Sequence, residues 1–410
     1  MTSMRAKPLR VGVFGLFGAG NSGNDGSLEA VLDHLRATRP DAVLDAMCGG
    51  PEIVATRYGI PATRLNWYRG EYRTASRASA VAGKALGKLV DVLRTAAWVR
   101  RHDAVIVPGT GVLETTLPLR PWGFPYSLFL LCLTGRLFGT RVALVSVGAG
   151  PIGNRPTRVL TRWSTRLAAY RSYRDDQSRD AMRAMGVDTA RDEVYADLVF
   201  ALPAPSASEP AGTRGPVCVG VMDFHGSNDE RDRAEEIHRR YLDGTTRFVR
   251  ALVEEGRPVR LLTGDELDRP VAAAIVDAVG SPLVTVAEAA SLADLMKETA
   301  SADSVVATRY HNLVCALKVG TPTLALSYSA KSDALMAEMG MGAYCHSARE
   351  AGADRLLEQF RELERRSAEV RRALFERNLA VARRVEQQFA ALAAALFPAA
   401  GHTHAPREAP

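Results

Sequence analysis

The sequence predicts an α/β protein built from two doubly wound Rossmann-like domains that face a cleft. Short apolar runs alternate with longer amphipathic stretches along most of the chain, a rhythm typical of parallel sheets with crossover helices. At 410 residues the chain is too long for one ordinary core. Residues 203–216, PAPSASEPAGTRGP, hold four prolines and no long apolar side chain, which is the composition of an exposed linker.

The domain organisation follows from that linker. We expect an N-terminal Rossmann-like domain at 1–205, the linker at 206–215, a second Rossmann-like domain at 216–345, helices at 346–397 and a disordered tail at 398–410. Strands are predicted at Leu9–Leu16, Ala42–Met47, Asp103–Pro108 and Arg141–Val147 in the first domain, and at Val217–Met222, Val259–Leu262, Leu283–Val286, Ser304–Ala307 and Thr323–Ser327 in the second.

Composition narrows the class of partner. The formal charge is 52 − 46 = +6, and it is spread along the chain without long basic blocks. Nucleic-acid readers usually concentrate their basic residues, so this balance favours small anionic substrates or a membrane surface. The five cysteines are far apart and form no CxxC pair, which argues against a metal centre or a disulfide framework and for a reducing cytoplasm.

The N-terminus and the apolar runs bear on location. The N-terminal stretch MTSMRAKPLRVGVFG lacks the apolar core of a signal peptide. The longest apolar run, YSLFLLCL at Tyr126–Leu133, falls short of the roughly 20 residues that cross a bilayer. We therefore expect a cytoplasmic protein, at most peripheral at the inner face of the membrane.

Cationic and titratable residues are predicted at the carboxyl ends of two strands of the second domain. Arg309 and His311 follow the strand Ser304–Ala307, and Lys331 follows Thr323–Ser327. Ligands of open α/β sheets bind at this edge, and a helix that begins there adds N–H donors suited to an anion. The expected ligand is negative, although each side chain could instead be structural or simply exposed.

Further candidates follow other predicted strands. Arg174 comes before the predicted start of a helix, where it either projects into the cleft or pairs with a neighbouring aspartate. His225 follows the first strand of the second domain. A glycine-rich turn, GLFGAGNSGNDGS, precedes a helix expected from about Leu28; Asn21 and Asp25 within it disfavour a dinucleotide site, which needs close backbone approach to pyrophosphate.

Several motifs resemble those of the polysaccharide pyruvyltransferase family. ATRYHNLVCALKVGTPTLALSYSAK carries an Arg-x-His, a Gly-x-Pro and then a Tyr with a Lys three residues later. Gly20-Asn21-Ser22-Gly23 is similar to a Gly-Asn-x-Gly-Asp loop in which Asp25 is shifted by one residue. The runs GTGVLE, GAGPIG and Arg174-Asp175-Asp176-Gln177-Ser178 match further signatures. The resemblance runs from Gly15 to Met341 and implies a fold of the glycosyltransferase-B type.

The resemblance implies an enzyme that moves the pyruvyl group of phosphoenolpyruvate onto hydroxyls of a sugar as a ketal, for a cell-envelope polysaccharide or glycolipid. The donor would bind between the domains and need no cofactor or metal, because protein cations neutralise it; the acceptor is a saccharide or lipid-linked saccharide. The implied site comprises Arg174 and Arg309 for phosphate and carboxylate, Lys331 for an anionic oxygen, His311 for proton transfer, Asn21, Asp25 and Glu114 for sugar hydroxyls, and His225 and Tyr328 for substrate binding.

Two other functions stay open. A nucleotide-sugar glycosyltransferase of the same fold would use the same basic site for a diphosphate. A non-catalytic glycan-binding protein is the expected outcome if the altered loop at Asn24 and Asp25 has lost the acceptor. The acceptor sugar, its linkage and the oligomeric state are not indicated by the sequence.

One predicted helix, from about Ala75 to Arg101, has a basic side. At about 100° per residue, Arg73, Arg77, Lys84 and Lys88 cluster on one face, and Leu86, Leu89 and Leu93 lie opposite. Such a face is either solvated above a core-facing leucine stripe or a patch for anionic lipid, since each basic residue adds about 1 kcal/mol at such a surface.

Overall fold

The computed structural model contains two compact units. It describes residues 8–68, 77–109, 111–114, 121–205, 215–226, 228–350 and 352–398. The first unit combines Met1–Ala19, Ser27–Leu198 and Arg384–Pro410, and the second combines Gly20–Gly26 and Val199–Arg383.

The first unit is built on a seven-stranded parallel sheet with the order β3-β2-β1-β4-β5-β6-β7. Its strands are β1 (Arg10–Gly15), β2 (Val43–Cys48), β3 (Ala62–Arg64), β4 (Ala104–Pro108), β5 (Arg141–Val147), β6 (Tyr170–Tyr173) and β7 (Glu193–Val194). Its helices are α1 (Ser22–Thr38), whose first turn groups with the second unit, α2 (Pro51–Tyr58), α3 (Arg77–Val99), α4 (Phe124–Phe138), α5 (Arg155–Leu167) and α6 (Asp176–Ala184).

The second unit repeats this plan with a six-stranded parallel sheet of order β10-β9-β8-β11-β12-β13. Its strands are β8 (Val217–Val221), β9 (Val259–Thr263), β10 (Val284–Val286), β11 (Ser304–Ala307), β12 (Thr323–Ser327) and β13 (Cys345–Ser347). Its helices are α7 (Ala234–Glu254), α8 (Arg269–Val279), α9 (Leu292–Ala300), α10 (Tyr310–Lys318), α11 (Ala330–Glu338) and α12 (Ala353–Arg365), and α13 (Ser367–Leu396) passes to the first unit at Arg384.

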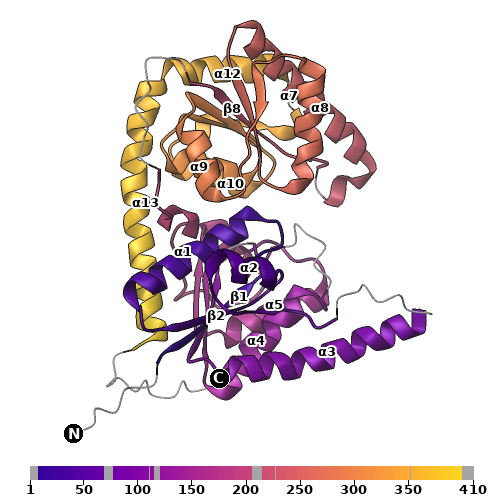
Figure 1. The fold of residues 1–410 in the computed structure, drawn as a ribbon, viewed down its shortest axis with the longest axis vertical. Coiled ribbons are helices and arrows are strands. Elements are labelled where there is room, and N and C mark those ends of the chain that lie inside the picture. The colour runs from indigo at the N-terminus through magenta and orange to yellow at the C-terminus, as the bar shows by residue number, and fades with distance from the viewer. Residues whose placement is uncertain are drawn as a thin grey trace. The chain divides into compact units, whose positions relative to one another are not determined.

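The central strands explain why both sheets are parallel. Every residue of β4, β8, β11 and β12 is buried, as expected of strands that have helices on both faces. In the second unit α9 and α10 cover one face, and α7, α8 and α12 cover the other (Figure 1). The prediction of two doubly wound α/β domains is confirmed.

The strand order places a ligand-binding edge in each unit. Strand addition reverses direction between β1 and β4 in the first unit and between β8 and β11 in the second. In doubly wound sheets the crevice at the carboxyl ends of such a strand pair is where ligands bind. The loops after β8 and β11 carry Asp223, His225 and Arg309, and His311 lies in the first turn of α10.

Some elements were not predicted from the sequence. The short elements α2, β3 and β13 were missed, and α1 begins at Ser22 rather than near Leu28. The cause of this early start is Asn21, whose Oδ1 accepts from the backbone N–H groups of Gly23 and Asn24, each at 3.1 Å. The glycine-rich turn is thus partly the capped first turn of a helix.

Helix α3 turns a different face outward from the one expected. Leu86, Leu89 and Leu93 are 55%, 66% and 72% exposed. Asp91 is buried instead, and its carboxylate accepts from the backbone N–H of Trp67 at 2.8 Å. The prediction of a core-facing leucine stripe is therefore wrong: the buried side of the helix carries Asp91, Thr95 and Trp98 instead.

The basic side of α3 is only partly described. Lys88 Nζ lies 3.3 Å from Asp91 Oδ2 and 3.2 Å from Asn66 Oδ1, so its charge is used inside the unit. Lys84 is exposed. Arg73 and the side chain of Arg77 lie outside the described residues, as do most of the expected linker and the tail.

Candidate functional site

The second unit gathers polar groups around one buried carboxylate at the carboxyl end of its sheet. Asp268, with 0% exposure, precedes α8. Its oxygens accept from the backbone N–H of Asp223 at 2.9 Å and of Gly264 at 3.2 Å. They also accept from Arg309 Nε at 2.9 Å and Nη2 at 2.6 Å. Asp268 thereby joins the loops that follow β8, β9 and β11.

Arg309 is held by this carboxylate while part of its side chain, 23%, stays exposed. Burial by itself would lower the pKa of Arg309, but the hydrogen bonds and charge of Asp268 more than offset burial and raise it above its usual range. The guanidinium is thus a permanent cation. It stands at the N-terminus of α10, where backbone N–H groups also favour an anion.

His311 and Lys331 both lie next to the ring of Tyr310. Tyr310 makes an edge-on contact with the His311 imidazole, with ring centroids 5.3 Å apart, and Lys331 Nζ lies 5.6 Å from the centroid of the same ring. A Cβ on Gly23 would stand 1.9 Å from His311 Cε1, so only glycine admits the ring at that position. The structure thus groups Arg309, His311 and Lys331 in one unit.

The loop that carries Asn21 and Asp25 belongs to this site and not to the first unit, where the expected domain boundaries placed it. Ser22 Oγ donates to the carbonyl of Gly264 at 3.2 Å, and Gly23 packs on His311. The side-chain oxygen of Asn21, Oδ1, caps α1. Asp25 is buried at 7% exposure. Asn21 and Asp25 therefore belong to the unit that carries Arg309, His311 and Lys331.

Arg174 is in the first unit and is surrounded by carboxylates. It pairs with Glu114, its Nε lies 3.3 Å from Asp175 Oδ2, and its Nη1 lies 3.8 Å from Asp197 Oδ2. The Arg174 and Glu114 residues are 4% and 8% exposed. A Cβ on Gly148 would stand 2.5 Å from both Arg174 Nη2 and Glu114 Oε1, so the glycine makes room for the pair.

The residues after Arg174 join neighbouring loops. Asp175 caps α6 by accepting from the Ser178 N–H at 2.6 Å. Ser178 Oγ in turn accepts from the backbone N–H of Ala149, at 3.0 Å, in the loop after β5. The Arg-Asp-x-x-Ser signature thus positions Glu114 and two loops of the first unit.

His225 and Tyr328 both lie in the second unit. His225 Nε2 lies 2.9 Å from Asp223 Oδ1, next to the Asp268 group. Tyr328 packs on Phe224 with ring centroids 5.9 Å apart and lines a pocket of about 300 Å³ together with Arg349. Tyr328 therefore borders a cavity large enough for part of a small substrate.

Two supporting residues were not identified from the sequence. Asp268 was missed because an aspartate before Arg-Pro looks like an ordinary helix start. Tyr241, on α7, was missed because it lies within an amphipathic helix. Its hydroxyl accepts from the Met222 N–H at 3.1 Å and lies 2.8 Å from Thr308 Oγ1, which joins the loops after β8 and β11. Both Asp268 and Tyr241 also lie far in sequence from the residues that they hold in place.

Comparisons with known proteins agree with this architecture. A family model described as "Polysaccharide pyruvyl transferase" matches residues 21–330. No curated protein matches the chain significantly in sequence.

Solved structures share the fold. A putative UDP-N-acetylglucosamine 2-epimerase from Listeria monocytogenes superposes with a TM-score of 0.62 at 15% identity, over 95% of this chain and 96% of that one. UDP-GlcNAc 2-epimerase from Neisseria meningitidis gives 0.59 at 12%, over 93% and 99%. MurG from Acinetobacter baumannii gives 0.53 at 12%, over 93% and 100%. The likeness is to the glycosyltransferase-B fold and extends to the fold alone.

The first prediction concerns Asp268. Asp268→Asn should lower the free energy of unfolding by about 3 kcal/mol, because it leaves the partly buried Arg309 charge without its partner. Urea denaturation followed by circular dichroism measures this. The control is Glu255→Gln, which breaks an exposed pair with Arg361 and should change stability by less than about 0.5 kcal/mol. Equal losses in the two variants would show that Asp268 is not a structural centre.

Proposed function

Because the chain belongs to the polysaccharide pyruvyl transferase family, we propose that it transfers the pyruvyl group of phosphoenolpyruvate onto two hydroxyls of one saccharide, forming a ketal and releasing phosphate. The observation that carries this proposal is the group of Arg309, His311 and Lys331 at one sheet edge of the second unit. We further propose that the protein acts in the cytoplasm, where phosphoenolpyruvate is available.

The donor dictates the residue types. Phosphoenolpyruvate carries a planar carboxylate and a phosphate with three terminal oxygens. A guanidinium binds either group with a pair of N–H donors. Arg309 and the N-terminus of α10 supply donors at one point, and Lys331 supplies a mobile charge nearby. Asp268 orients the Arg309 fork, so little freedom is lost when the donor binds.

The reaction requires one acid and balances without a redox partner. His311 gives a proton to the methylene carbon of the donor, which becomes the methyl group, while one sugar hydroxyl adds to C2. The second hydroxyl then displaces the phosphate from C2. Of the two hydroxyl protons, one restores His311 and the other leaves with phosphate. Tyr310 and Gly23 both pack against the imidazole.

We propose that Glu114 binds the hydroxyls of the acceptor sugar, with Asn21 and Asp25 as further candidates. A carboxylate accepts hydrogen bonds from sugar hydroxyls, and Glu114 is positioned by its pair with Arg174. We propose that Arg174 is a positioning residue for Glu114 and not a ligand of the donor, because its guanidinium is already engaged with the carboxylates of Glu114, Asp175 and Asp197.

The assay measures which donor is consumed. Purified protein is incubated with a saccharide or lipid-linked saccharide pool and phosphoenolpyruvate, and phosphate release is followed. Acceptor-dependent release supports the proposal. Release of UDP or GDP from nucleotide sugars, with no phosphate from phosphoenolpyruvate, would replace it by a glycosyltransferase. Neither product would indicate a glycan-binding protein.

Variants separate binding from chemistry within that assay. His311→Ala should lower turnover by about 10² to 10⁴ with donor binding retained, since only the acid is lost.

Arg309→Lys should weaken donor binding by about tenfold or more, because it loses paired donation while keeping the charge. His34→Ala and Arg269→Lys are the matched controls; His34 stacks on Phe389 in the first unit, and Arg269 is exposed. A stable, fully active His311→Ala would refute the acid role.

We also propose that the first unit docks on anionic lipid, which would suit a lipid-linked acceptor. Among the described residues no helix is both long and apolar enough to cross a bilayer. Helix α4 packs between α3 and α5 (Figure 1). Helix α3 presents its exposed leucines, and α4 exposes Leu137 and Phe138 at 69% and 46%. Neighbouring exposed apolar side chains of this kind mark a surface that binds a protein or a membrane.

Helix α5 supports lipid as that partner. Its inward positions are Thr and Ser, whereas Val159 and Trp163 are each 50% exposed. Arg155 and Arg166 are exposed on the same helix. Trp beside aliphatic and basic residues is typical of helices that lie in the interface of anionic membranes.

Sedimentation with vesicles tests this surface. Changing Leu86, Leu89 and Leu93 together to Ser should lower binding to anionic liposomes by at least about tenfold, because apolar burial is lost. The control, Phe375→Ser with Leu379→Ser, removes equally exposed residues of α13 and should leave binding unchanged. If the leucine variant binds vesicles normally but changes sedimentation velocity in their absence, the surface joins two copies of the chain instead.

A further inference from the structure

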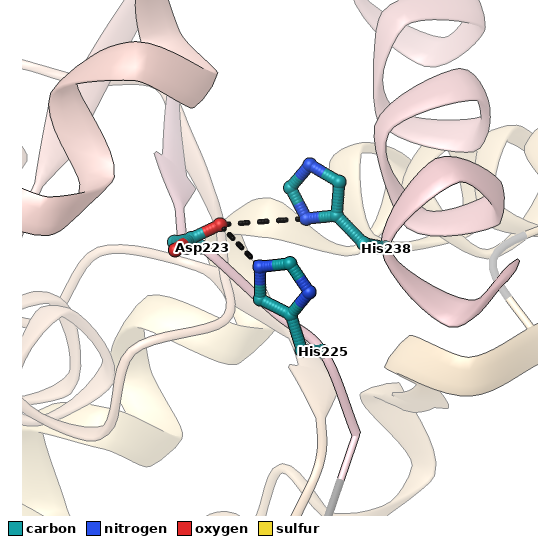
Figure 2. Close-up of side chains that lie close together, drawn as sticks. All are labelled: Asp223, His225 and His238. Atoms are coloured by element: carbon teal, nitrogen blue, oxygen red, sulfur yellow. Dashed lines mark hydrogen bonds and ion pairs between the residues drawn. The ribbon is translucent and has the colours of Figure 1, made fainter. Parts of the chain in front are cut away.

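Three potential metal ligands meet beside the Asp268 group. Asp223 and His225 lie in the loop after β8, and His238 lies on α7 (Figure 2). Asp223 Oδ1 is 2.9 Å from His225 Nε2 and 3.4 Å from His238 Nδ1, and the three ligand atoms lie within 4.8 Å of one another. Figure 2 shows both imidazoles directed at the same carboxylate oxygen.

A hydrogen-bond network accounts for only part of this arrangement. His225 satisfies the carboxylate oxygen, but His238 Nδ1 is buried and makes no hydrogen bond with good geometry. A buried polar atom without a partner is costly, and here it lies beside an anionic oxygen. An ion bound by all three atoms would satisfy the nitrogen and the oxygen together.

The distances suit a small transition-metal ion. Zinc bonds of about 2.0–2.2 Å to nitrogen and oxygen put neighbouring ligands of a tetrahedron about 3.3 Å apart. Two of the three separations in the structure, 2.9 and 3.4 Å, lie near this value. Two imidazoles and one carboxylate favour zinc and its neighbours over magnesium or calcium, which prefer oxygen.

Binding requires one ring to turn. The two imidazole planes lie 9° apart with centroids separated by 4.3 Å, whereas an ion must lie near the plane of each ring it binds. His225 is 40% exposed and can rotate towards the ion, while His238 is 23% exposed and more firmly held. The exposure of His225 and Asp223 also leaves room for water or a substrate oxygen at the remaining position.

The geometry points to a divalent transition-metal site formed by Asp223, His225 and His238, selective for zinc-like ions. This site cannot be recognised from sequence, because Asp223-x-His225 lacks its third ligand until α7 brings His238 to the loop. The backbone of Asp223 donates to Asp268, which also holds Arg309, so the ion would stiffen the loop next to that guanidinium. The inference does not depend on the proposed transfer reaction.

Metal titration of the full chain tests the site. The protein is stripped with chelator, and His402 and His404 of the tail are changed to Ala so that they cannot bind. We expect one equivalent of Zn²⁺ per chain by calorimetry. Co²⁺ should give the visible absorption of a tetrahedral ion, and Zn²⁺ should raise the melting temperature.

Single substitutions identify the ligands. His225→Ala, His238→Ala and Asp223→Asn should each weaken Zn²⁺ binding by at least about 100-fold, since losing even an outer-shell partner costs 10–100-fold. His34→Ala should bind as the parent does. If a variant is unstable, the Co²⁺ spectrum of the folded parent still decides. The absence of the tetrahedral spectrum, or Zn²⁺ binding in the parent no tighter than in the His225→Ala/His238→Ala double variant, would overturn the proposal.

Discussion

The buried carboxylate of Asp268 is the constraint on which the second unit's site depends. It binds the backbone after β8, the backbone after β9 and the guanidinium after β11, so three adjacent strand ends have one common partner. A carboxylate with no solvent contact is stable only when its oxygens are satisfied, and here four donors satisfy them. The same contacts leave the Arg309 fork oriented and partly exposed, which is what an anion needs.

Glycines let the remaining groups approach. Gly23 admits the His311 ring and Gly148 admits the pair of Arg174 and Glu114, because a Cβ at either position would collide with the functional side chains. The glycine-rich loops therefore allow polar side chains of neighbouring elements to pack directly against the loop backbone. Both units use a glycine in the same way, to make room for a polar side chain of a neighbouring element.

The fold could be predicted because its signals are local. Apolar runs at β4, β8 and β11, each buried along its length, alternate with helices, and this rhythm implies parallel sheets. Arg309, His311 and Lys331 could be placed at one edge of the predicted sheet because strand ends are visible in sequence. The features that were not predicted depend on distant partners. Asp268 pairs with a residue 41 positions away, and Asp91 of α3 accepts from the backbone N–H of Trp67, 24 positions away. No periodicity records such pairs.

In the proposed reaction, His311 protonates the methylene carbon of phosphoenolpyruvate beside Arg309, and the resulting skeleton passes to a sugar. The most direct measurement is the mass of the glycan product formed in deuterium oxide. The account predicts that the pyruvyl methyl group acquires a single deuterium from solvent and that phosphate appears in equal amount. A pyruvylated product formed without deuterium, or a glycosylated product with no pyruvyl group, would contradict it.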